Sequence, residues 1–462
     1  MTKGSAEMKY IETDKNFYKK LLVMAMPLAA QTLITTGVNM VDNIMVGQLG
    51  ETGLSATTLA TQFIMLYQFC IMGVSMGSSV LTSRFWGAQD LVSLKKTVTI
   101  ALRISCLLSL AVTVVSSLFA VPIMTLFSKD ANVIAQGAAY LRWSLPTYLL
   151  TALATVCTNV LRSVGLAAVP FVASLAAFGV NIGANYIFIF GKLGAPAMGV
   201  AGAALGTAIA RVVEMSVICG YFFCVDRKIR YRLCDLRQKC GDLLREFWRI
   251  SMPVLVSDGL LGVGDSVLAI IMGHIGSQFV SANSITAVTQ RVSTIFISSI
   301  AFASCFIIGQ TLGENRVESA KKQGSTFFVL GAGIGLVACG LIQLLKTPII
   351  GIYNIQPETR AITDQLMNAI SVIVVFRSTN SILTKGVLRG GGDTQFLMVA
   401  DIGFLWLIAI PLGAVAGLVL HLPAFWIYFC LYIDQIIKAV WCIWRLHSGK
   451  WIKKIKTADV YS

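Results

Sequence analysis

Four aspartates lie inside long apolar runs of this sequence: Asp42, Asp258, Asp265 and Asp401. A carboxylate in such a run is costly to bury, so we expect it to bind a cation, carry a proton or pair with a base. Asp258 and Asp265 are seven positions apart, which places them on one helical face, about two turns from each other. The sequence therefore indicates ion or proton chemistry within apolar helices.

Arg377 is a basic residue in a later apolar run, and we expect it to pair with Asp258 or Asp265. Two interpretations of these acids and of Asp401 stay open. They attract a cationic substrate or carry protons, or they only neutralise Arg377 inside the helix bundle. Asp42 also has an alternative, as a capping or interfacial carboxylate close to the outer surface.

Two further charge pairs have helical spacing, Arg211 with Glu214 and Asp434 with Lys438. Residues three or four positions apart meet on one helix face. We interpret both pairs as structural contacts within single helices.

Composition excludes an ordinary soluble protein. The 462 residues are 56% hydrophobic and 13% charged, with a mean hydropathy of +0.76. A soluble domain carries about 25% charged residues. The net charge of +15 would suggest nucleic acid in a soluble chain, but the basic residues lie mainly between apolar runs, so we expect no nucleic-acid partner. The apolar surface must face lipid.

Twelve apolar runs have the roughly 20 residues that a membrane-spanning helix needs. We expect helices near 21–47, 54–83, 97–121, 137–162, 168–191, 198–225, 248–273, 280–310, 325–345, 362–388, 396–420 and 423–445.

Basic residues between these runs predict the orientation. Alternate loops hold only Lys129, Lys192, Lys346 and Arg360, whereas the remaining polar segments hold many more Lys and Arg residues. Because cytoplasmic loops are enriched in Lys and Arg, we expect both termini in the cytoplasm. The densest basic cluster lies within 226–247, and we interpret it as a topological anchor that contacts anionic lipid; a partner-binding role is the alternative.

An internal repeat divides the chain into halves. At an offset of 226 positions Pro27 aligns with Pro253, Gly47 with Gly273 and Gly50 with Gly276, and near 227 the stretch 160–162 aligns with 387–389. Six helices per half is an even number, so the halves have the same orientation. The predicted fold is an all-α integral membrane protein of twelve helices in two six-helix lobes, a parallel pseudo-twofold repeat around a central cavity.

The predicted organisation has five parts. They are a cytoplasmic N-terminus at 1–20, an N-lobe at 21–225, a basic cytoplasmic linker at 226–247, a C-lobe at 248–445 and a basic cytoplasmic tail at 446–462.

Several short segments form an ordered set along nearly the whole chain. They are Pro27, Val41-Asp42, 46–50, 54–56, Asn181 with 185–191, 199–204, 388–394 and 445–451. This set resembles the multidrug and toxic compound extrusion (MATE) family of transporters, and the last segment resembles its bacterial Firmicutes-type branch. The resemblance implies a secondary antiporter, not an enzyme, that exports organic, often cationic and amphipathic compounds by alternating access. It implies no cofactor and no use of ATP, in agreement with the missing GxxxxGK[ST] loop.

The resemblance also implies a cation-coupling site. Asp42 matches the family's carboxylate of the first lobe, and Asn181, Asn185 and Thr207 match the positions around it. Their oxygens suit Na⁺, and a desolvated Asp42 suits H⁺, so the coupling ion is Na⁺ or H⁺ and no other metal is expected. Asn185 stands where some members have a second aspartate.

Pro27 matches the family's proposed bending point. A proline inside a helix removes a backbone donor and kinks the helix. Hinge and static packing kink both stay open for Pro27.

Two other functions are alternatives to export. A flippase for lipid-linked precursors would need a cationic cavity for phosphate, and a non-transporting scaffold or sensor would normally add a soluble domain. The acids inside the spans favour cationic cargo over the flippase. The expected partners are small organic molecules and membrane lipid, the expected state is a monomer, and the expected location is a bacterial inner membrane.

Overall fold

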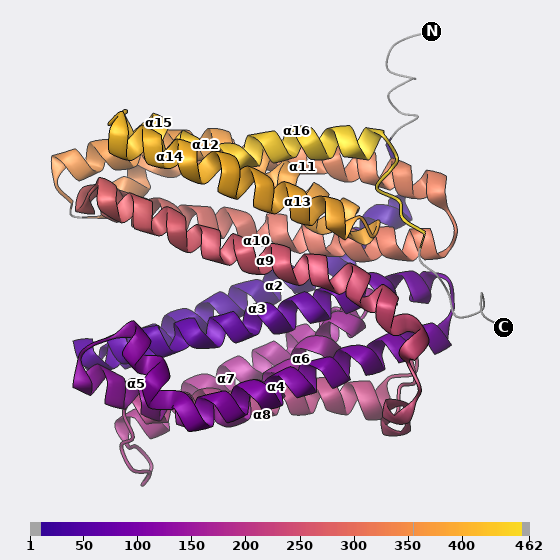
Figure 1. Cartoon of the computed structure of the whole chain (residues 1–462), viewed down its shortest axis with the longest axis horizontal. Coiled ribbons are helices and arrows are strands. Elements are labelled where there is room, and N and C mark those ends of the chain that lie inside the picture. The colour runs from indigo at the N-terminus through magenta and orange to yellow at the C-terminus, as the bar shows by residue number, and fades with distance from the viewer. Residues whose placement is uncertain (1–10, 354, 455–462) are drawn as a thin grey trace. The chain divides into compact units, whose positions relative to one another are not determined.

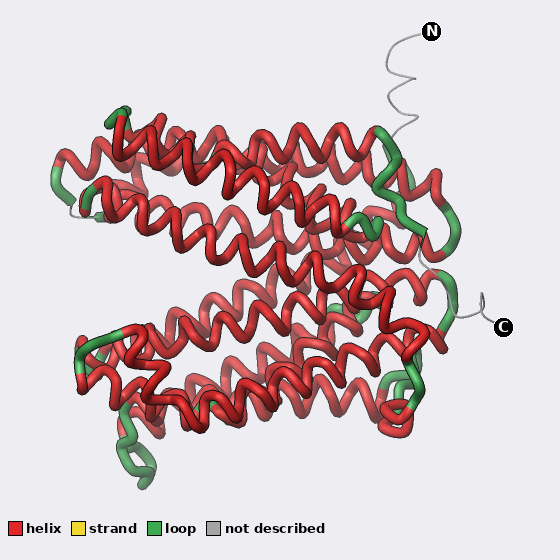
Figure 2. The backbone as a smooth tube through the Cα atoms, in the orientation of Figure 1, coloured by secondary structure: helices red, strands yellow, loops and turns green. Residues whose placement is uncertain are grey.

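The computed structural model describes residues 11–353 and 355–454. Helices and short connections make up this part of the chain, which contains no β-strand (Figure 2). The long helices lie side by side within each half (Figure 1).

The helices of the first half correspond to the six predicted spans. They are α2 (Lys15–Gly47), α3 (Glu51–Gly87), α4 (Leu91–Phe127), α5 (Ala131–Trp143), α6 (Leu145–Ser163), α7 (Ala168–Phe190) and α8 (Val200–Gly220), which continues as a π-helical turn at Tyr221–Val225. A 3₁₀ turn at Leu233–Arg237 lies in the connection to the second half.

The helices of the second half follow the same order. They are α9 (Gly241–Ile275), α10 (Ser277–Gly313), α11 (Val317–Ile352), α12 (Pro357–Ser381), α13 (Thr394–Phe404), α14 (Ile410–Ala414), α15 (Ala424–Leu431) and α16 (Ile433–His447). Three π-helical segments continue these helices. One extends α12 at Ile382–Leu388, one joins α13 to α14 at Leu405–Ala409, and one follows α14 at Val415–Val419.

Ten helices of the described chain are each long and apolar enough to cross a membrane. Two bent pairs raise the number to twelve, namely α5 with α6, bent by 50°, and α15 with α16, bent by 43°. The predicted twelve-helix fold is therefore confirmed. Several helices extend beyond the predicted ranges, as α2 does, because polar residues such as Lys15 and Lys20 form helical turns outside the apolar run.

The helices form two compact units. The C-unit contains the described residues up to Ala25, Gly87–Gln89 and the described residues from Val256 onward, and the N-unit contains Met26–Trp86 and Asp90–Leu255. Helix α2 thus begins in the C-unit and continues in the N-unit after Ala25, and α9 changes unit after Leu255. Both changes lie within two residues of a repeat proline, Pro27 or Pro253.

Small side chains allow close packing inside the N-unit. A Cβ on Gly73 would meet the backbone of Leu255, and one on Gly77 would meet Ser251. Helix α3 also buries a run of hydroxyl residues that donate to their own backbone, as Ser78 does to the carbonyl of Ser75 at 2.8 Å. Membrane helices use such small residues to approach one another closely.

Candidate ion-coupling site

Asp42 and Asn185 form the centre of the site in the N-unit. The side-chain amide of Asn185, on α7, donates a hydrogen bond of 2.5 Å to Asp42 Oδ1 on α2. Asn185 is completely buried and Asp42 is half-buried. The two helices thus join a carboxylate to an amide at a distance typical of a charge-assisted hydrogen bond.

Asn181 lies one turn before Asn185 on the same face of α7. Its Oδ1 accepts a hydrogen bond of 3.4 Å from Asn185 Nδ2. Asn181 also lines a small cavity of about 50 Å³ together with Asn39 of α2 and Thr207 of α8. The structure therefore brings Asp42, Asn185 and Asn181 together and places Thr207 on the wall of the adjoining cavity.

The absence of a side chain at Gly206 leaves space for the side chain of Asn185. A Cβ built on Gly206 of α8 would collide with Asn185 Oδ1, so only glycine permits α8 to approach α7 this closely. Asn185 Oδ1 is itself buried and has no hydrogen-bond partner among the described residues. A buried acceptor of this kind is usually satisfied by a water or an ion, and it lies on the same side chain that binds Asp42.

This set of atoms suits a small cation. Carboxylate, amide and hydroxyl oxygens are hard ligands of the kind that alkali and alkaline-earth ions prefer, and a proton on Asp42 would satisfy the same carboxylate. No cluster of three or more His, Cys, Asp or Glu residues able to hold a metal occurs in the described residues. A weakly held, exchangeable ion fits this site better than a tightly held transition metal.

In the C-unit, Asp258 pairs with Arg389 and not with Arg377. The Arg389 Nη2 lies 3.0 Å from Asp258 Oδ1 and its Nη1 lies 3.3 Å from Oδ2, a bidentate contact. Arg389 follows the π-helical end of α12 and its side chain is only 4% exposed. The expected pairing of Asp258 with Arg377 is therefore wrong.

Asp401 is also paired. Lys438 Nζ lies 3.4 Å from Asp401 Oδ1 and 2.8 Å from Asp434 Oδ2, so one ammonium joins two carboxylates. Ser257 Oγ donates a further hydrogen bond of 2.7 Å to Asp401. The predicted Asp434–Lys438 pair is confirmed, but the contact with Asp401 joins α16 to α13 and was not predicted.

Asp265 and Arg377 remain without a direct ionic partner in the described chain. No ion pair within 4.0 Å involves either residue, although Arg377 and Lys385 act electrostatically on Asp265. Arg377 Nη1 is buried and has no hydrogen-bond acceptor. Lys385 lies in the middle of the π-helical segment Ile382–Leu388, a rare geometry that often occurs at functional sites.

The internal repeat indicates a role for Arg389, because it aligns this residue with another arginine. Arg162 and Arg389 occupy equivalent repeat positions, and each contacts the first helix of its own half a few residues after the proline. Arg162 Nη2 donates to Gln31 Oε1 at 2.5 Å, as Arg389 does to Asp258. A basic residue repeated in both halves was therefore a candidate partner for the first helices.

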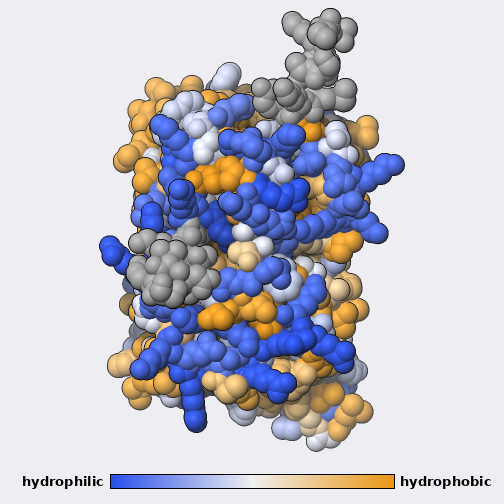
Figure 3. Space-filling view, turned by 90° about the vertical axis from the view of Figure 1, so that its right-hand side faces the viewer, coloured by the Kyte–Doolittle hydropathy of each residue, from blue (hydrophilic) through white to orange (hydrophobic). Residues whose placement is uncertain are grey.

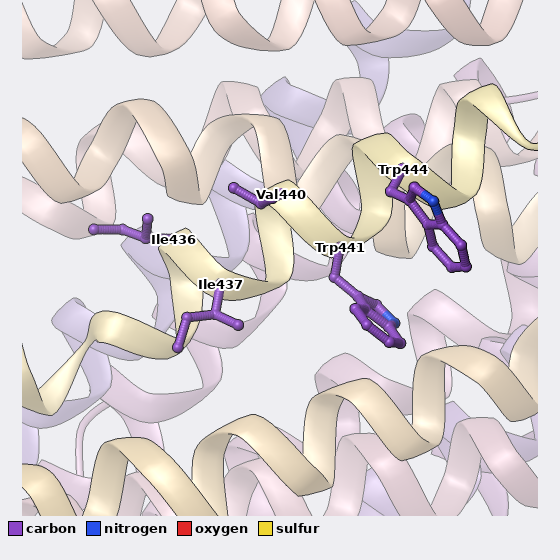
Figure 4. Close-up of a pocket in the computed structure, with 5 residues that line it drawn as sticks. All are labelled: Ile436, Ile437, Val440, Trp441 and Trp444. Atoms are coloured by element: carbon purple, nitrogen blue, oxygen red, sulfur yellow. The ribbon is translucent and has the colours of Figure 1, made fainter.

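A separate apolar depression lies on α16. It is lined by Ile436, Ile437, Val440, Trp441 and Trp444 (Figure 4). It has no charged group that could hold a cation. Tryptophans near a helix end are typical of membrane–water interfaces, so this surface fits hydrocarbon chains of lipid.

Comparisons with known proteins agree with this arrangement. A family model described as MatE matches residues 27–187 and 253–415, so its two parts begin at the two repeat prolines. The uncharacterized transporter YisQ of Bacillus subtilis is 21% identical over 443 residues, 96% of this chain and 96% of its own. The probable multidrug resistance protein NorM of Pasteurella multocida is 23% identical over 437 residues, 91% of this chain and 93% of its own.

Solved structures share the fold. A MOP superfamily transporter from Pyrococcus furiosus matches with a TM-score of 0.83 and 20% identity, over 94% of this chain and 96% of that one. The family model covers well over half of the sequence and both halves of the repeat. The chain belongs to the MatE family of multi-pass membrane transporters.

Proposed function

We propose that this transporter exports organic, amphipathic cations in exchange for Na⁺ or H⁺ through alternating access, with Asp42 as the cation-coupling carboxylate. The observation that carries the proposal is the contact between Asp42 and Asn185, whose other amide atom is a buried acceptor without a partner. Asn181 and Thr207 supply further oxygens beside it. NorM of Pasteurella multocida is itself named a probable multidrug resistance protein.

Fewer acidic residues of the C-unit are available to bind a cationic substrate than the sequence predicted. Asp258 and Asp401 already have basic partners, so they are poor attractors of a second cation. Asp265 has no direct ion pair among the described residues and is exposed, which makes it the best substrate-binding acid of the C-unit. Proton or cation binding at the paired acids would first have to break these contacts.

An anionic cargo, such as a lipid-linked precursor, has one observation in its favour. Arg377 Nη1 is buried without an acceptor, and Lys385 forms no ion pair within the described residues. A phosphate or carboxylate would satisfy both groups. The Pyrococcus furiosus protein is described as having a binding pocket of reverse polarity that suggests a different function. We therefore keep anionic cargo as the second candidate.

For the orientation we propose a bacterial plasma membrane with both chain ends in the cytoplasm. Hydrophilic residues gather on the face drawn in Figure 3, and apolar residues lie along its flanks. In the N-unit the connection between α8 and α9 carries the exposed Arg227, Arg230 and Arg232. Basic residues concentrated at one end of the helices favour that end as the cytoplasmic one. We further propose that the protein acts as a monomer.

The test uses purified protein in proteoliposomes with an imposed Na⁺ or H⁺ gradient. A fluorescent organic cation and an anionic lipid-linked analogue serve as the two cargoes. We expect one of the two gradients to drive movement of the organic cation against its concentration gradient. Absence of gradient-driven movement of the cation would contradict the proposal, and movement of the anionic analogue alone would favour the second candidate.

A further inference from the structure

Arg211 and Glu214 of α8 form an ion pair next to the Asp42 site. Arg211 Nη1 lies 2.5 Å from Glu214 Oε2. The Glu214 side chain is 11% exposed and that of Arg211 is 35% exposed. Both residues line the small cavity that Asn181 and Thr207 also line, so the pair lies beside two residues of the ion site.

Arg211 is the cation within the N-unit that acts electrostatically on Asp42. It follows Thr207 by one turn of α8, and Asn39 precedes Asp42 by about one turn of α2. Thr207, Arg211 and Asn39 all face the same cavity. The long, flexible side chain of Arg211 lines this cavity, so its guanidinium can compete with other cations for the carboxylate of Asp42.

Glu214 is fixed on its other side by neutral and basic groups. Ser174 Oγ of α7 donates to Glu214 Oε1 at 3.1 Å, and Gln31 Nε2 of α2 donates to Ser174 Oγ at 2.7 Å. Gln31 Oε1 in turn accepts from Arg162 Nη2 at 2.5 Å. This chain of hydrogen bonds crosses four helices and holds the carboxylate of Glu214 on the side of Ser174.

The chain continues into the core of the N-unit. Arg162 Nη1 donates to Asn159 Oδ1 at 3.2 Å, and Asn159 Nδ2 donates to Ser75 Oγ at 2.8 Å. Asn159 and Ser75 are almost completely buried. Amide groups in the middle of the chain are poor proton carriers, so its role is to hold charges in place and not to conduct protons.

We propose that Glu214 is a positioning residue that holds Arg211 away from Asp42 and so keeps the cation site open. This inference rests on the proposed cation-coupling role of Asp42. With Arg211 on Glu214, the direct partners of the Asp42 carboxylate among the described residues are neutral amides, of which Asn185 donates the hydrogen bond of 2.5 Å. Without the charge of Glu214, Arg211 turns to Asp42 and competes with the coupling cation.

The carboxylates of Asp42 and Glu214 each have several polar or charged neighbours. Asp42 is faced by Asn185, Asn181, Arg211 and Tyr140, and Glu214 is faced by Arg211, Ser174 and Arg162. Asp42 and Glu214 are therefore the two acids that share Arg211. A purely structural pair within α8 would stabilise the helix and would leave cation affinity at Asp42 unchanged.

The test compares variants in the proteoliposome assay by the cation concentration, Na⁺ or H⁺, that gives half-maximal transport. Glu214→Gln should raise that concentration at least about tenfold, because two unit charges in contact near a protein surface interact by more than this factor. The double variant Glu214→Gln with Arg211→Gln should return it to the parent value. Arg211→Gln alone should leave it equal to or below the parent value.

A matched control is the second pair of the same type in the N-unit, in which Glu246 Oε2 lies 3.5 Å from Arg249 Nη1. Glu246→Gln should leave the half-maximal concentration unchanged. Each variant is compared at equal amounts of folded protein, measured by size-exclusion chromatography. The double variant has no unpaired Arg211, so its half-maximal concentration can still be compared with that of the parent where Glu214→Gln folds poorly.

An unchanged half-maximal concentration in Glu214→Gln, or no recovery in the double variant, would overturn the inference. Asp42→Asn is included to separate the two claims. If Asp42→Asn keeps its cation dependence, the proposed function itself fails. If Asp42→Asn loses cation dependence while Glu214→Gln keeps the parent value, only the role of Glu214 fails.

Discussion

At the scale of single residues, the Asp258–Arg389 contact is the buried ion pair that joins α9 to the end of α12. Its two hydrogen bonds of 3.0 and 3.3 Å are bidentate, and Arg389 is almost fully enclosed. Removal of one member of such a pair leaves an uncompensated buried charge. The pair therefore predicts a mutual dependence that an exposed pair would not show.

Arg389→Gln should lower the stability of the protein by about 3–5 kcal/mol, because Asp258 is left without its counter-charge. The second change Asp258→Asn should restore most of this loss. Thermal unfolding in detergent, followed by size-exclusion chromatography, measures both effects. Arg377→Gln serves as the control, since Asp258→Asn should not rescue it; rescue of Arg377→Gln and not of Arg389→Gln would refute the pairing.

Part of this residue-level picture was predictable from the sequence. Spacing predicted the Arg211–Glu214 and Asp434–Lys438 pairs, which the structure confirms at 2.5 and 2.8 Å. Spacing says nothing about partners on different helices, so Arg389 and the Lys438–Asp401 contact were missed. The roles of Asp42, Asn181, Asn185 and Thr207 stay predictions, although the structure brings the first three into hydrogen-bonding contact.

At the scale of elements, the linker between the halves packs against α4. Lys95 Nζ lies 3.0 Å from Asp235, and Arg103 Nη2 donates to the carbonyls of Leu236 and Gln238 at 2.5 and 3.0 Å. Tyr231 is buried, and its hydroxyl lies 2.8 Å from Thr99 Oγ1. The linker is thus an ordered element as well as a carrier of exposed basic residues.

The pKa of Asp235 carries a prediction for this element. Burial would raise the pKa, but hydrogen bonds from the Arg232 backbone and from Lys95 outweigh it and hold the pKa below the usual 3.8. An acid with a lowered pKa stabilises the docked state above its usual pKa and loses that contribution only as the pH falls through the lowered value. Linker docking should therefore be constant between about pH 5 and pH 8, well above that pKa.

Asp235→Asn removes the charge at every pH and should speed amide hydrogen exchange in residues 226–240 by several-fold at pH 7. Hydrogen exchange with mass spectrometry measures the change. Asp242→Asn is the matched control, because Asp242 pairs with Lys96 in a more exposed contact of 2.7 Å that contributes little. Equal exchange in the parent and Asp235→Asn proteins would show that Lys95 and Asp235 do not hold the linker.

At the scale of the whole molecule, the chain passes from one unit to the other next to Pro27 and Pro253. Helix α2 changes unit after Ala25, and α9 does so after Leu255. A proline weakens a helix by removing a backbone hydrogen bond. The coincidence of proline and unit boundary in both halves favours a hinge at Pro27 over a packing kink.

Pro27→Ala should slow transport at least about tenfold while substrate binding stays near the parent value, because the restored hydrogen bond stiffens the hinge. Counterflow in proteoliposomes and dye binding in detergent measure the two quantities. Pro122→Ala, another proline inside a long helix, is the control and should transport like the parent. Parent-like transport by Pro27→Ala would leave only the packing kink.

Most of the fold was predictable at this scale. Every predicted span corresponds to a helix or bent helix pair of the structure, and the repeat predicted two halves. Several helices were predicted too short, because hydropathy does not detect polar turns such as those before Leu21. The change of unit within α2 and α9 was not predicted, because hydropathy identifies a helix but not the residues against which each turn packs.

The central claim is that Asp42 couples transport to a cation. The most direct measurement is gradient-driven counterflow by Asp42→Asn in proteoliposomes, at an amount of folded protein equal to that of the parent. The asparagine keeps the size of the side chain and removes its charge and its proton. We expect gradient-driven transport to be abolished while dye binding persists, and transport at the parent rate would contradict the account.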